Sequence, residues 1–261
     1  MSKTLIVGNW KMYLNASQAS LLAYRLQEHI KTNRDVEVVL APSMLTLQPV
    51  SLQIDRKKFK LAAQNAFYQD QGAYTGEVSF TMLRDLIHYC IIGHSERRYI
   101  FNESEDDITK KVTAAYRNGI IPILCIGETK SERLDGETNR VINDQLVTAL
   151  ANVTSVEVEK LVVAYEPVWS IGTGDFAKPS LVEAAVKVIR KNISALYGDK
   201  AAQEVRVLYG GSVMADIAGG YLGAKGVDGL LVGGASLNYQ QFSDIVNAAG
   251  RKKSKQNSKE G

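Results

Sequence analysis

Short apolar runs recur along the chain at nearly regular intervals, and each is apolar at consecutive rather than alternate positions. This pattern is typical of strands that are covered on both faces, as in a parallel sheet. It predicts eight strands, at residues 4–8, 36–41, 60–64, 89–93, 121–127, 160–166, 205–210 and 229–234.

The segments between these runs carry apolar residues at spacings of three and four, which is the period of an amphipathic helix. The clearest examples are residues 17–30, 181–196 and 239–249. A further helix begins after Ser104, which suits an N-cap, and stops at Gly119.

Eight alternating strands and helices without a linker predict an α/β fold, a single-domain (β/α)8 barrel of the TIM-barrel type, over residues 1–250. The alternative is an open, doubly wound sheet. Such a sheet usually carries a G-x-G-x-x-G turn after its first strand, whereas this chain has Gly8-Asn9-Trp10-Lys11 there.

Composition supports a folded protein: 45% of the 261 residues are hydrophobic and 23% are charged. The net charge of +3 is misleading, because residues 251–261 hold five basic residues and one acidic residue. The remaining 250 residues therefore carry a net charge of −1. We expect a basic, disordered tail over 251–261 and no nucleic-acid partner for the folded body.

Nothing in the sequence favours a membrane or secreted protein. No apolar stretch approaches the roughly 18 residues that span a bilayer, and residues 1–11 lack a signal-peptide layout. Cys90 and Cys125 each lie in an apolar stretch, so we expect buried free thiols, no metal site and a cytoplasmic location.

In a barrel of this kind, the polar residues that follow the strands share one rim. Glycine pairs follow the last two predicted strands, in 210–212 and 233–236, and glycine lets successive backbone N–H groups approach a ligand. We therefore expect a phosphate site there. The other polar groups at strand ends are Asn9, Lys11, His94, Ser95, Glu96 and Glu166.

One acid, one imidazole and one ammonium suit proton transfer next to a carbonyl, with the acid as base and the other two stabilising charge on oxygen. Glu166 ends a strand directly before Pro167 and a glycine-containing segment. A flap at this place would exclude water from the carboxylate and from a reactive intermediate.

Seven motifs, in this order, closely resemble the triosephosphate isomerase family: GNWKM, AQNA…GAYTGE, IIGHSERR, CIGE, AYEPVWSIGTG, YGGSV and LVGGASL. The resemblance runs from about residue 4 to 249. It implies a cofactor-independent isomerase of glycolysis and gluconeogenesis that interconverts dihydroxyacetone phosphate and D-glyceraldehyde 3-phosphate through an enediolate.

The resemblance also implies roles for particular residues. Glu166 would be the base, His94 a neutral electrophile, Lys11 the compensating cation, Asn9 an orienting group and Glu96 a supporting carboxylate. Further residues would bind phosphate or form the lid. The phosphate ligands would be Gly172, Ser212, Gly233 and Gly234, and the lid would comprise Pro167, Val168, Trp169, Ser170, Ile171, Gly172, Thr173 and Gly174.

A homodimer is implied as well. Thr75, at the tip of a loop, would enter the neighbouring subunit near its Asn9 and Lys11, and Glu77 would meet Arg98 across the boundary. The chain departs from the usual family pattern at Tyr13, Ser170 and Asp175, and none of these changes removes a catalytic group.

Two other functions remain open at this point. A barrel that binds sugar phosphates without catalysis would lack the base or the imidazole, yet Glu166 and His94 are both present. A barrel aldolase would need a Schiff-base lysine at a strand end or metal-binding histidines. No predicted strand ends in lysine, and the chain has three histidines.

Overall fold

The computed structural model describes residues 3–31, 34–171 and 175–257, and its eight parallel strands close into a barrel in chain order. All eight lie within two residues of the predicted positions, so the expected fold is confirmed and the open sheet is excluded. The strands are β1 (Thr4–Asn9), β2 (Val36–Ala41), β3 (Phe59–Ala63), β4 (Tyr89–Ile92), β5 (Ile121–Ile126), β6 (Val162–Tyr165), β7 (Arg206–Tyr209) and β8 (Gly229–Val232).

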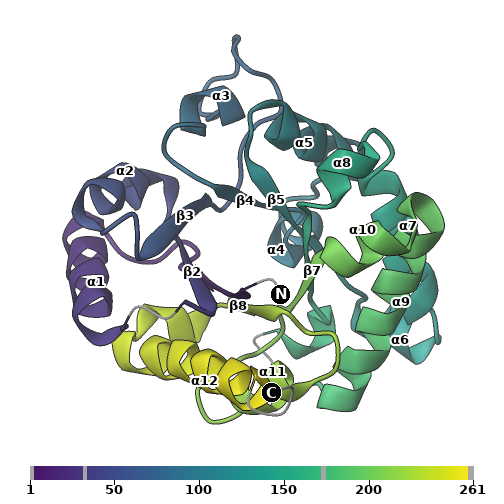
Figure 1. Ribbon diagram of the computed structural model, residues 1–261. Coiled ribbons are helices and arrows are strands. Elements are labelled where there is room, and N and C mark those ends of the chain that lie inside the picture. The colour runs from purple at the N-terminus through teal and green to yellow at the C-terminus, as the bar shows by residue number, and fades with distance from the viewer. Residues whose placement is uncertain (1–2, 32–33, 172–174, 258–261) are drawn as a thin grey trace.

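Helices surround the barrel (Figure 1). The four predicted ones are α1 (Ala16–His29), α5 (Glu105–Arg117), α9 (Pro179–Tyr197) and α12 (Tyr239–Asn257). None of the described helices is long and apolar enough to cross a membrane. The helical segments that the sequence did not predict are α2 (Met44–Gln53), α3 (Phe80–Leu83), α4 (Ser95–Tyr99), α6 (Lys130–Leu134), α7 (Thr138–Ala149), α8 (Ser155–Val158), α10 (Asp199–Glu204), α11 (Ala218–Gly223) and the 3₁₀ turns η1 (Val168–Ser170) and η2 (Gly234–Leu237).

The end predicted for the last helix was wrong. We expected the helix to stop at residue 249, but α12 continues to Asn257. Residues 251–257 read RKKSKQN, with neither glycine nor proline, and basic residues are favourable near a helix C-terminus. Residues 258–261 lie outside the described part, and the division of the chain at residue 250 stays a prediction.

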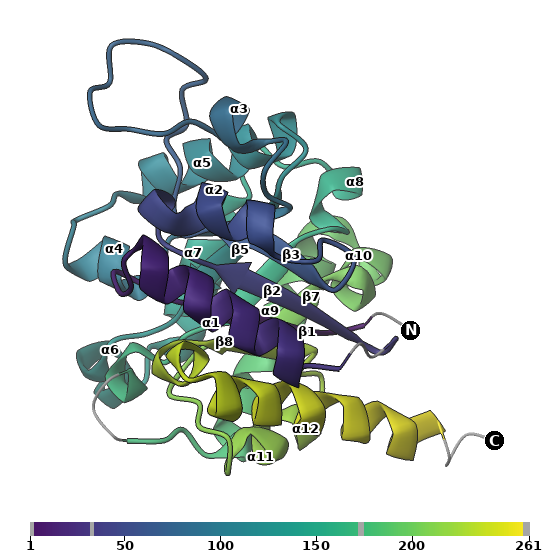
Figure 2. The ribbon, with the colours of Figure 1, turned by 90° about the vertical axis from the view of Figure 1, so that its left-hand side faces the viewer.

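Alternate strand residues fill two separate cores. Leu5 and Val7 of β1 join a cluster inside the barrel, whereas Ile6 between them joins the larger cluster beneath the helices. Because all the strands are parallel, their carboxyl ends open at one mouth. Figure 2 shows α4 and α6 at that mouth, and both chain termini at the other.

Candidate active site

A cavity of about 720 Å³ opens at the carboxyl ends of the strands. Every predicted catalytic and phosphate-binding residue within the described part lines it, and Gly172 lies outside that part. The structure therefore brings together residues from five strand ends. These residues are Asn9, Lys11, His94, Glu96, Glu166, Ser212, Gly233 and Gly234.

Glu166 follows β6 and is only 1% exposed. Its Oε2 accepts a hydrogen bond of 3.0 Å from the backbone N–H of Ser95. Its Oε1 lies 3.2 Å from His94 Nε2, but without hydrogen-bond geometry, so Oε1 has no donor among the described residues. One carboxylate oxygen is held, and the other keeps its lone pairs available to take a proton.

His94 lies directly before α4 and caps this helix with its ring. Its Nδ1 accepts the backbone N–H of Glu96 at 3.2 Å. A neutral imidazole that accepts at Nδ1 carries its proton at Nε2, and Nε2 is the atom nearer Glu166. The helix cap thus leaves an N–H donor beside the carboxylate.

Lys11 is held from three directions at the end of β1. Its Nζ lies 2.6 Å from Glu96 Oε1, and Asn9 Oδ1 accepts its backbone N–H at 3.1 Å. Gln64 Nε2 donates to the Lys11 carbonyl oxygen at 2.9 Å and to that of Ala41 at 2.8 Å. We had not singled out Gln64, although it lies in the quoted AQNA motif. It fixes the β1 turn against β2 and so positions the ammonium.

The two glycine-rich turns lie against the base and the cation. A Cβ on Gly210 would come within 2.9 Å of Glu166 Cγ, and one on Gly233 within 3.5 Å of Lys11 Cε. A Cβ at position 210 would crowd Glu166, whereas one at position 233 would make an ordinary contact with Lys11. The backbones after β7 and β8 are thus close enough to share one small ligand with Glu166 and Lys11.

Comparison with known proteins decides the family. Residues 4–249 match the family model described as triosephosphate isomerase. The chain belongs to the triosephosphate isomerase family.

Three curated relatives carry the name triosephosphate isomerase. The protein of Dictyoglomus turgidum is 42% identical over 94% of this chain and 99% of its own length. That of Caldanaerobacter subterraneus subsp. tengcongensis is 42% identical over 95% of this chain and all of its own length. The protein of Clostridium tetani is 41% identical over 95% of this chain and 97% of its own length.

Within this family member, Glu128 anchors the segment around Trp169, where the predicted lid begins. Glu128 is fully buried, and it accepts Trp169 Nε1–H at 3.0 Å and the Tyr165 hydroxyl at 3.0 Å. The Arg133 guanidinium lies 4.1 Å from the centre of the Trp169 ring. Burial, followed by the Glu128 charge, raises the pKa of Tyr165 and keeps its donor proton in place. Residues 172–174 of the predicted lid lie outside the described residues.

We predict that Glu128→Ala lowers the free energy of unfolding by about 2–3 kcal/mol, because the buried Tyr165 hydroxyl and the half-buried Trp169 N–H lose a charged acceptor. Urea unfolding followed by circular dichroism measures the change. Glu204→Ala serves as a control, since Glu204 is exposed at the end of α10. Equal stability of the two variants would show that Glu128 does not anchor Trp169.

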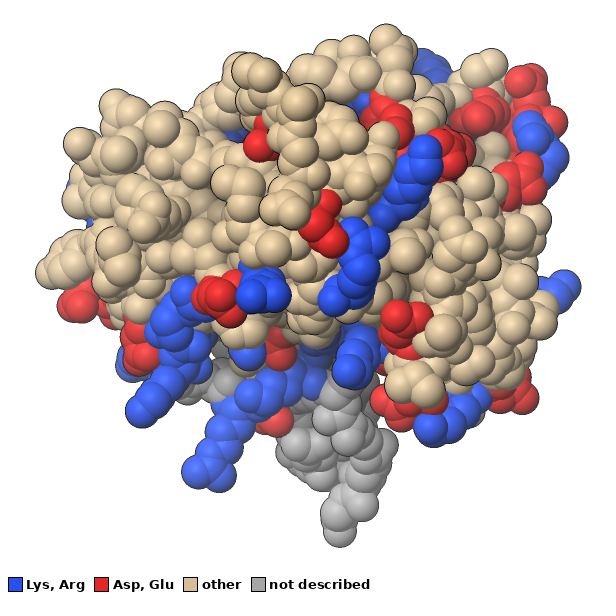
Figure 3. All heavy atoms as spheres, turned by 90° about the horizontal axis from the view of Figure 1, so that it is seen from above, with Lys and Arg blue, Asp and Glu red and all other residues tan. Residues whose placement is uncertain are grey.

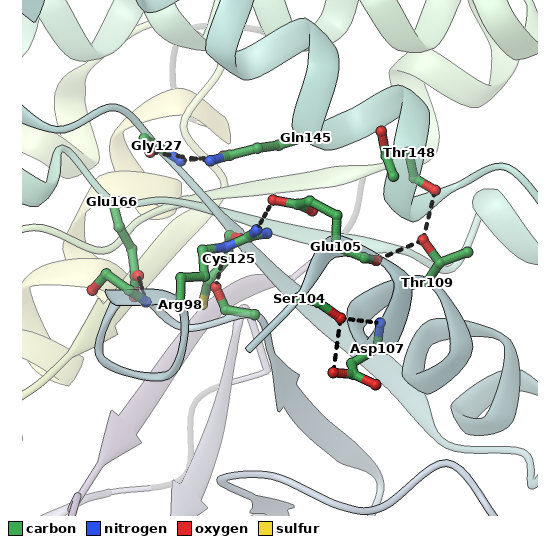
Figure 4. A network of polar contacts seen from close by, with 12 residues as sticks. Arg98, Ser104, Glu105, Asp107, Thr109, Cys125, Gly127, Gln145, Thr148 and Glu166 are labelled. Carbon is green, nitrogen blue, oxygen red and sulfur yellow. Dashed lines mark hydrogen bonds and ion pairs between the residues drawn. The ribbon is translucent and has the colours of Figure 1, made fainter. Parts of the chain in front are cut away.

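Arg98 forms its hydrogen bonds and ion pair within its own chain and is not free at the surface (Figure 4). Its guanidinium pairs with Glu105 and donates to the carbonyl oxygens of Gly93 and Cys125, and its side chain is 6% exposed. Arg97, which is 30% exposed, instead lines the same cavity as Glu77. The predicted contact of Glu77 with Arg98 across a dimer stays untested.

Cys125, on β5, points toward Glu166. Complete burial, followed by the charge of Glu166, raises the pKa of the Cys125 thiol, so this side chain stays neutral next to the base. Cys90 is likewise buried and free, which confirms the prediction of two buried free thiols. No described cluster of three or more His, Cys, Asp and Glu residues is placed to hold a metal.

The cavity also has a wall that sequence reasoning missed. Tyr13, which is 58% exposed, lines it together with Phe176 and Gln241. Tyr13 had been noted only as a departure from the family pattern. No local signal placed these three residues together, because they lie in three different loops or helices of the chain.

Proposed function

We propose that this chain interconverts dihydroxyacetone phosphate and D-glyceraldehyde 3-phosphate without a cofactor. The observation that carries the proposal is the approach of Glu166 Oε1 to His94 Nε2, at 3.2 Å, inside a cavity that also holds Lys11. Membership of the triosephosphate isomerase family supports the same reaction.

In the proposed mechanism, Glu166 removes a proton from C1 of dihydroxyacetone phosphate. The electron pair of that C–H bond forms the C1–C2 double bond, and negative charge moves to the carbonyl oxygen. His94 Nε2–H donates to this oxygen, and a proton exchange between the two oxygens prepares an aldehyde at C1. Glu166 then returns a proton to C2, so no atom or electron is gained or lost.

The phosphate would lie at the glycine-rich turns. Backbone N–H groups of Gly172, Ser212, Gly233 and Gly234 are proposed to bind it, with Lys11 balancing its charge and Asn9 orienting the substrate. The lid over residues 167–174 would close over the phosphate and keep water from the enediolate. The Glu128 contacts described above would form the fixed end of this lid.

The direct test supplies purified protein with D-glyceraldehyde 3-phosphate and follows dihydroxyacetone phosphate by NMR in the presence of a chelator. Product formed catalytically supports the proposal. Binding of the substrate without turnover would support a sugar-phosphate-binding protein instead. Cleavage or condensation of the carbon chain would indicate an aldolase.

We further propose that the protein is a homodimer in the cytoplasm. Met12 and Phe101, which are 95% and 64% exposed, border a second cavity of about 350 Å³ next to Lys11. Exposed apolar side chains around a cavity are typical of an interface, and Thr75 of a second copy would fill this one. Glu77 of one copy is proposed to meet Arg98 of the other. The free thiols Cys90 and Cys125 suit a reducing compartment.

Thr75→Arg is expected to convert the dimer to a monomer, because a long charged side chain does not fit the proposed cavity. Sedimentation velocity would show a species of twice the 28.6 kDa chain mass for the unaltered protein and of one chain mass for the variant. Thr148→Arg, on the exposed face of α7, is the matched control and should leave the dimer intact. Full activity in a monomeric variant would contradict the role given to Thr75.

A further inference from the structure

A separate basic pocket lies at the mouth of the barrel opposite Glu166. Its volume is about 340 Å³, and it is formed by residues at the amino ends of β1, β2 and β3 together with α12. The described residues that line it include five cationic side chains and neither Asp nor Glu. The five cations are Lys3, Lys31, Arg34, Lys57 and Lys58.

Within the part of the chain that the structure describes, the cations of this pocket have no carboxylate in an ion pair with them. Asp55 accepts the backbone N–H of Lys57 but does not line the pocket. Residues 1–250 carry a net charge of −1, and without these five cations the net charge of the same residues is −6. Positive charge is thus concentrated at one place on an otherwise acidic body, where it attracts anions.

Part of the pocket is already organised. The Lys58 ammonium donates to the carbonyl oxygen of Gln27 near the end of α1, which holds it in place while two of its three N–H donors remain for a ligand. The floor is apolar and buried, formed by Ile30, Val36 and Val246 among others. A fixed cation above a rigid floor reduces the ordering cost of binding.

Figure 3 shows Lys and Arg side chains along its lower edge, with Asp and Glu side chains between them, on the face of the termini in Figure 1. The helix that supplies Val246 also continues into the basic sequence RKKSKQN. Cations from three separate parts of the sequence thus converge on the mouth of the barrel opposite Glu166: Lys3, Lys31 with Arg34, and Lys57 with Lys58.

We infer that this pocket binds a compact anion bearing several phosphate groups, free in solution. Five cations without acidic partners match a ligand with three or more negative charges better than a single phosphate. The volume lies at the small end of the range for small-molecule sites. A nucleic-acid strand or a membrane would contact only the rim. The inference does not depend on the proposed isomerase reaction.

The test is isothermal titration calorimetry of the full chain with tripolyphosphate, with orthophosphate as the low-charge comparison. We expect one tripolyphosphate site per chain, much weaker binding of orthophosphate, and an affinity that falls as salt rises. The double variant Lys31→Glu and Lys57→Glu should weaken tripolyphosphate binding by about tenfold or more. Its melting temperature without ligand should not fall, because the substitutions remove repulsion between cations.

Two control variants separate the pocket from general charge. Lys187→Glu with Lys191→Glu makes the same charge change on the exposed side of α9 and should leave binding within about twofold of the unaltered protein. Replacing the lysines at 252, 253 and 255 by glutamine tests the tail. Isomerase activity should be unchanged in the pocket and α9 variants, since both sites are remote from Glu166.

Three results would overturn the inference. One is an absence of tripolyphosphate binding. Another is an equal loss of affinity in the pocket and α9 variants, which would show only non-specific attraction. The third is binding outside the pocket. Such binding would depend on the tail lysines alone, or would be seen with phosphatidylglycerol vesicles or a single-stranded oligonucleotide but not with tripolyphosphate.

Discussion

Glu166→Gln should lower kcat by about 10³-fold and leave the fold intact. The amide has nearly the shape of the carboxylate, and its oxygen can still accept the backbone N–H of Ser95 as Oε2 does. It has no basic lone pair with which to take the substrate proton. Because the loss falls on proton transfer rather than on substrate binding, KM should change little. Steady-state kinetics and thermal melting measure the two effects.

Glu166→Asp is the matched control for this prediction. It keeps a carboxylate but shortens the side chain by one methylene, which displaces the base by about 1 Å and costs about 10²-fold. The Asp variant should therefore be more active than the Gln variant. A Gln variant with near-full activity would remove Glu166 from the mechanism.

The second large effect is expected for Gly127→Ala. A Cβ on Gly127 would lie 1.8 Å from the Glu166 carbonyl oxygen, a distance that no relaxation of a side chain relieves, because the contact is with backbone. Gln145 bonds both the N–H and the carbonyl oxygen of Gly127, so this residue cannot move away freely (Figure 4). The backbone of the base must shift instead.

We expect Gly127→Ala to lower the free energy of unfolding by about 3 kcal/mol and kcat by about 10²-fold in the protein that folds. Chemical unfolding and kinetics of the soluble fraction provide both values. Gly219→Ala is the control: Gly219 lies in α11 with open space around it, so a methyl group there should be neutral or slightly stabilising. Normal activity and stability of Gly127→Ala would show that β5 and β6 separate easily.

The barrel and most of the site could be predicted from local sequence. A strand such as β2, which is buried along nearly its whole length, leaves a continuous apolar run. The site follows from topology, because parallel strands place their carboxyl ends together. His94 and Glu166 are far apart in the sequence, yet the rule that both follow strands was enough to bring them to one cavity.

The structural features that could not be predicted are those that leave no local pattern in the sequence. Helices as short as α3 and α8, with four residues each, complete barely one turn and show no period. The bond from Trp169 to Glu128 joins residues 41 apart, and that from Gln64 to Lys11 joins residues 53 apart. The bond from Arg98 in α4 to the carbonyl oxygen of Cys125 in β5 joins residues 27 apart and leaves no local pattern either.

The pairing of β1 with β8 has a consequence for synthesis. Leu5 and its neighbours find their partners only at residues 229–232, in the last of the eight strands to be synthesised. Until then β1 emerges from the ribosome with one edge of unpaired backbone groups, the kind of surface that other chains can join. The nascent polypeptide should thus be prone to aggregate until β8 has been synthesised, and ribosome-associated chaperones should matter most before that point.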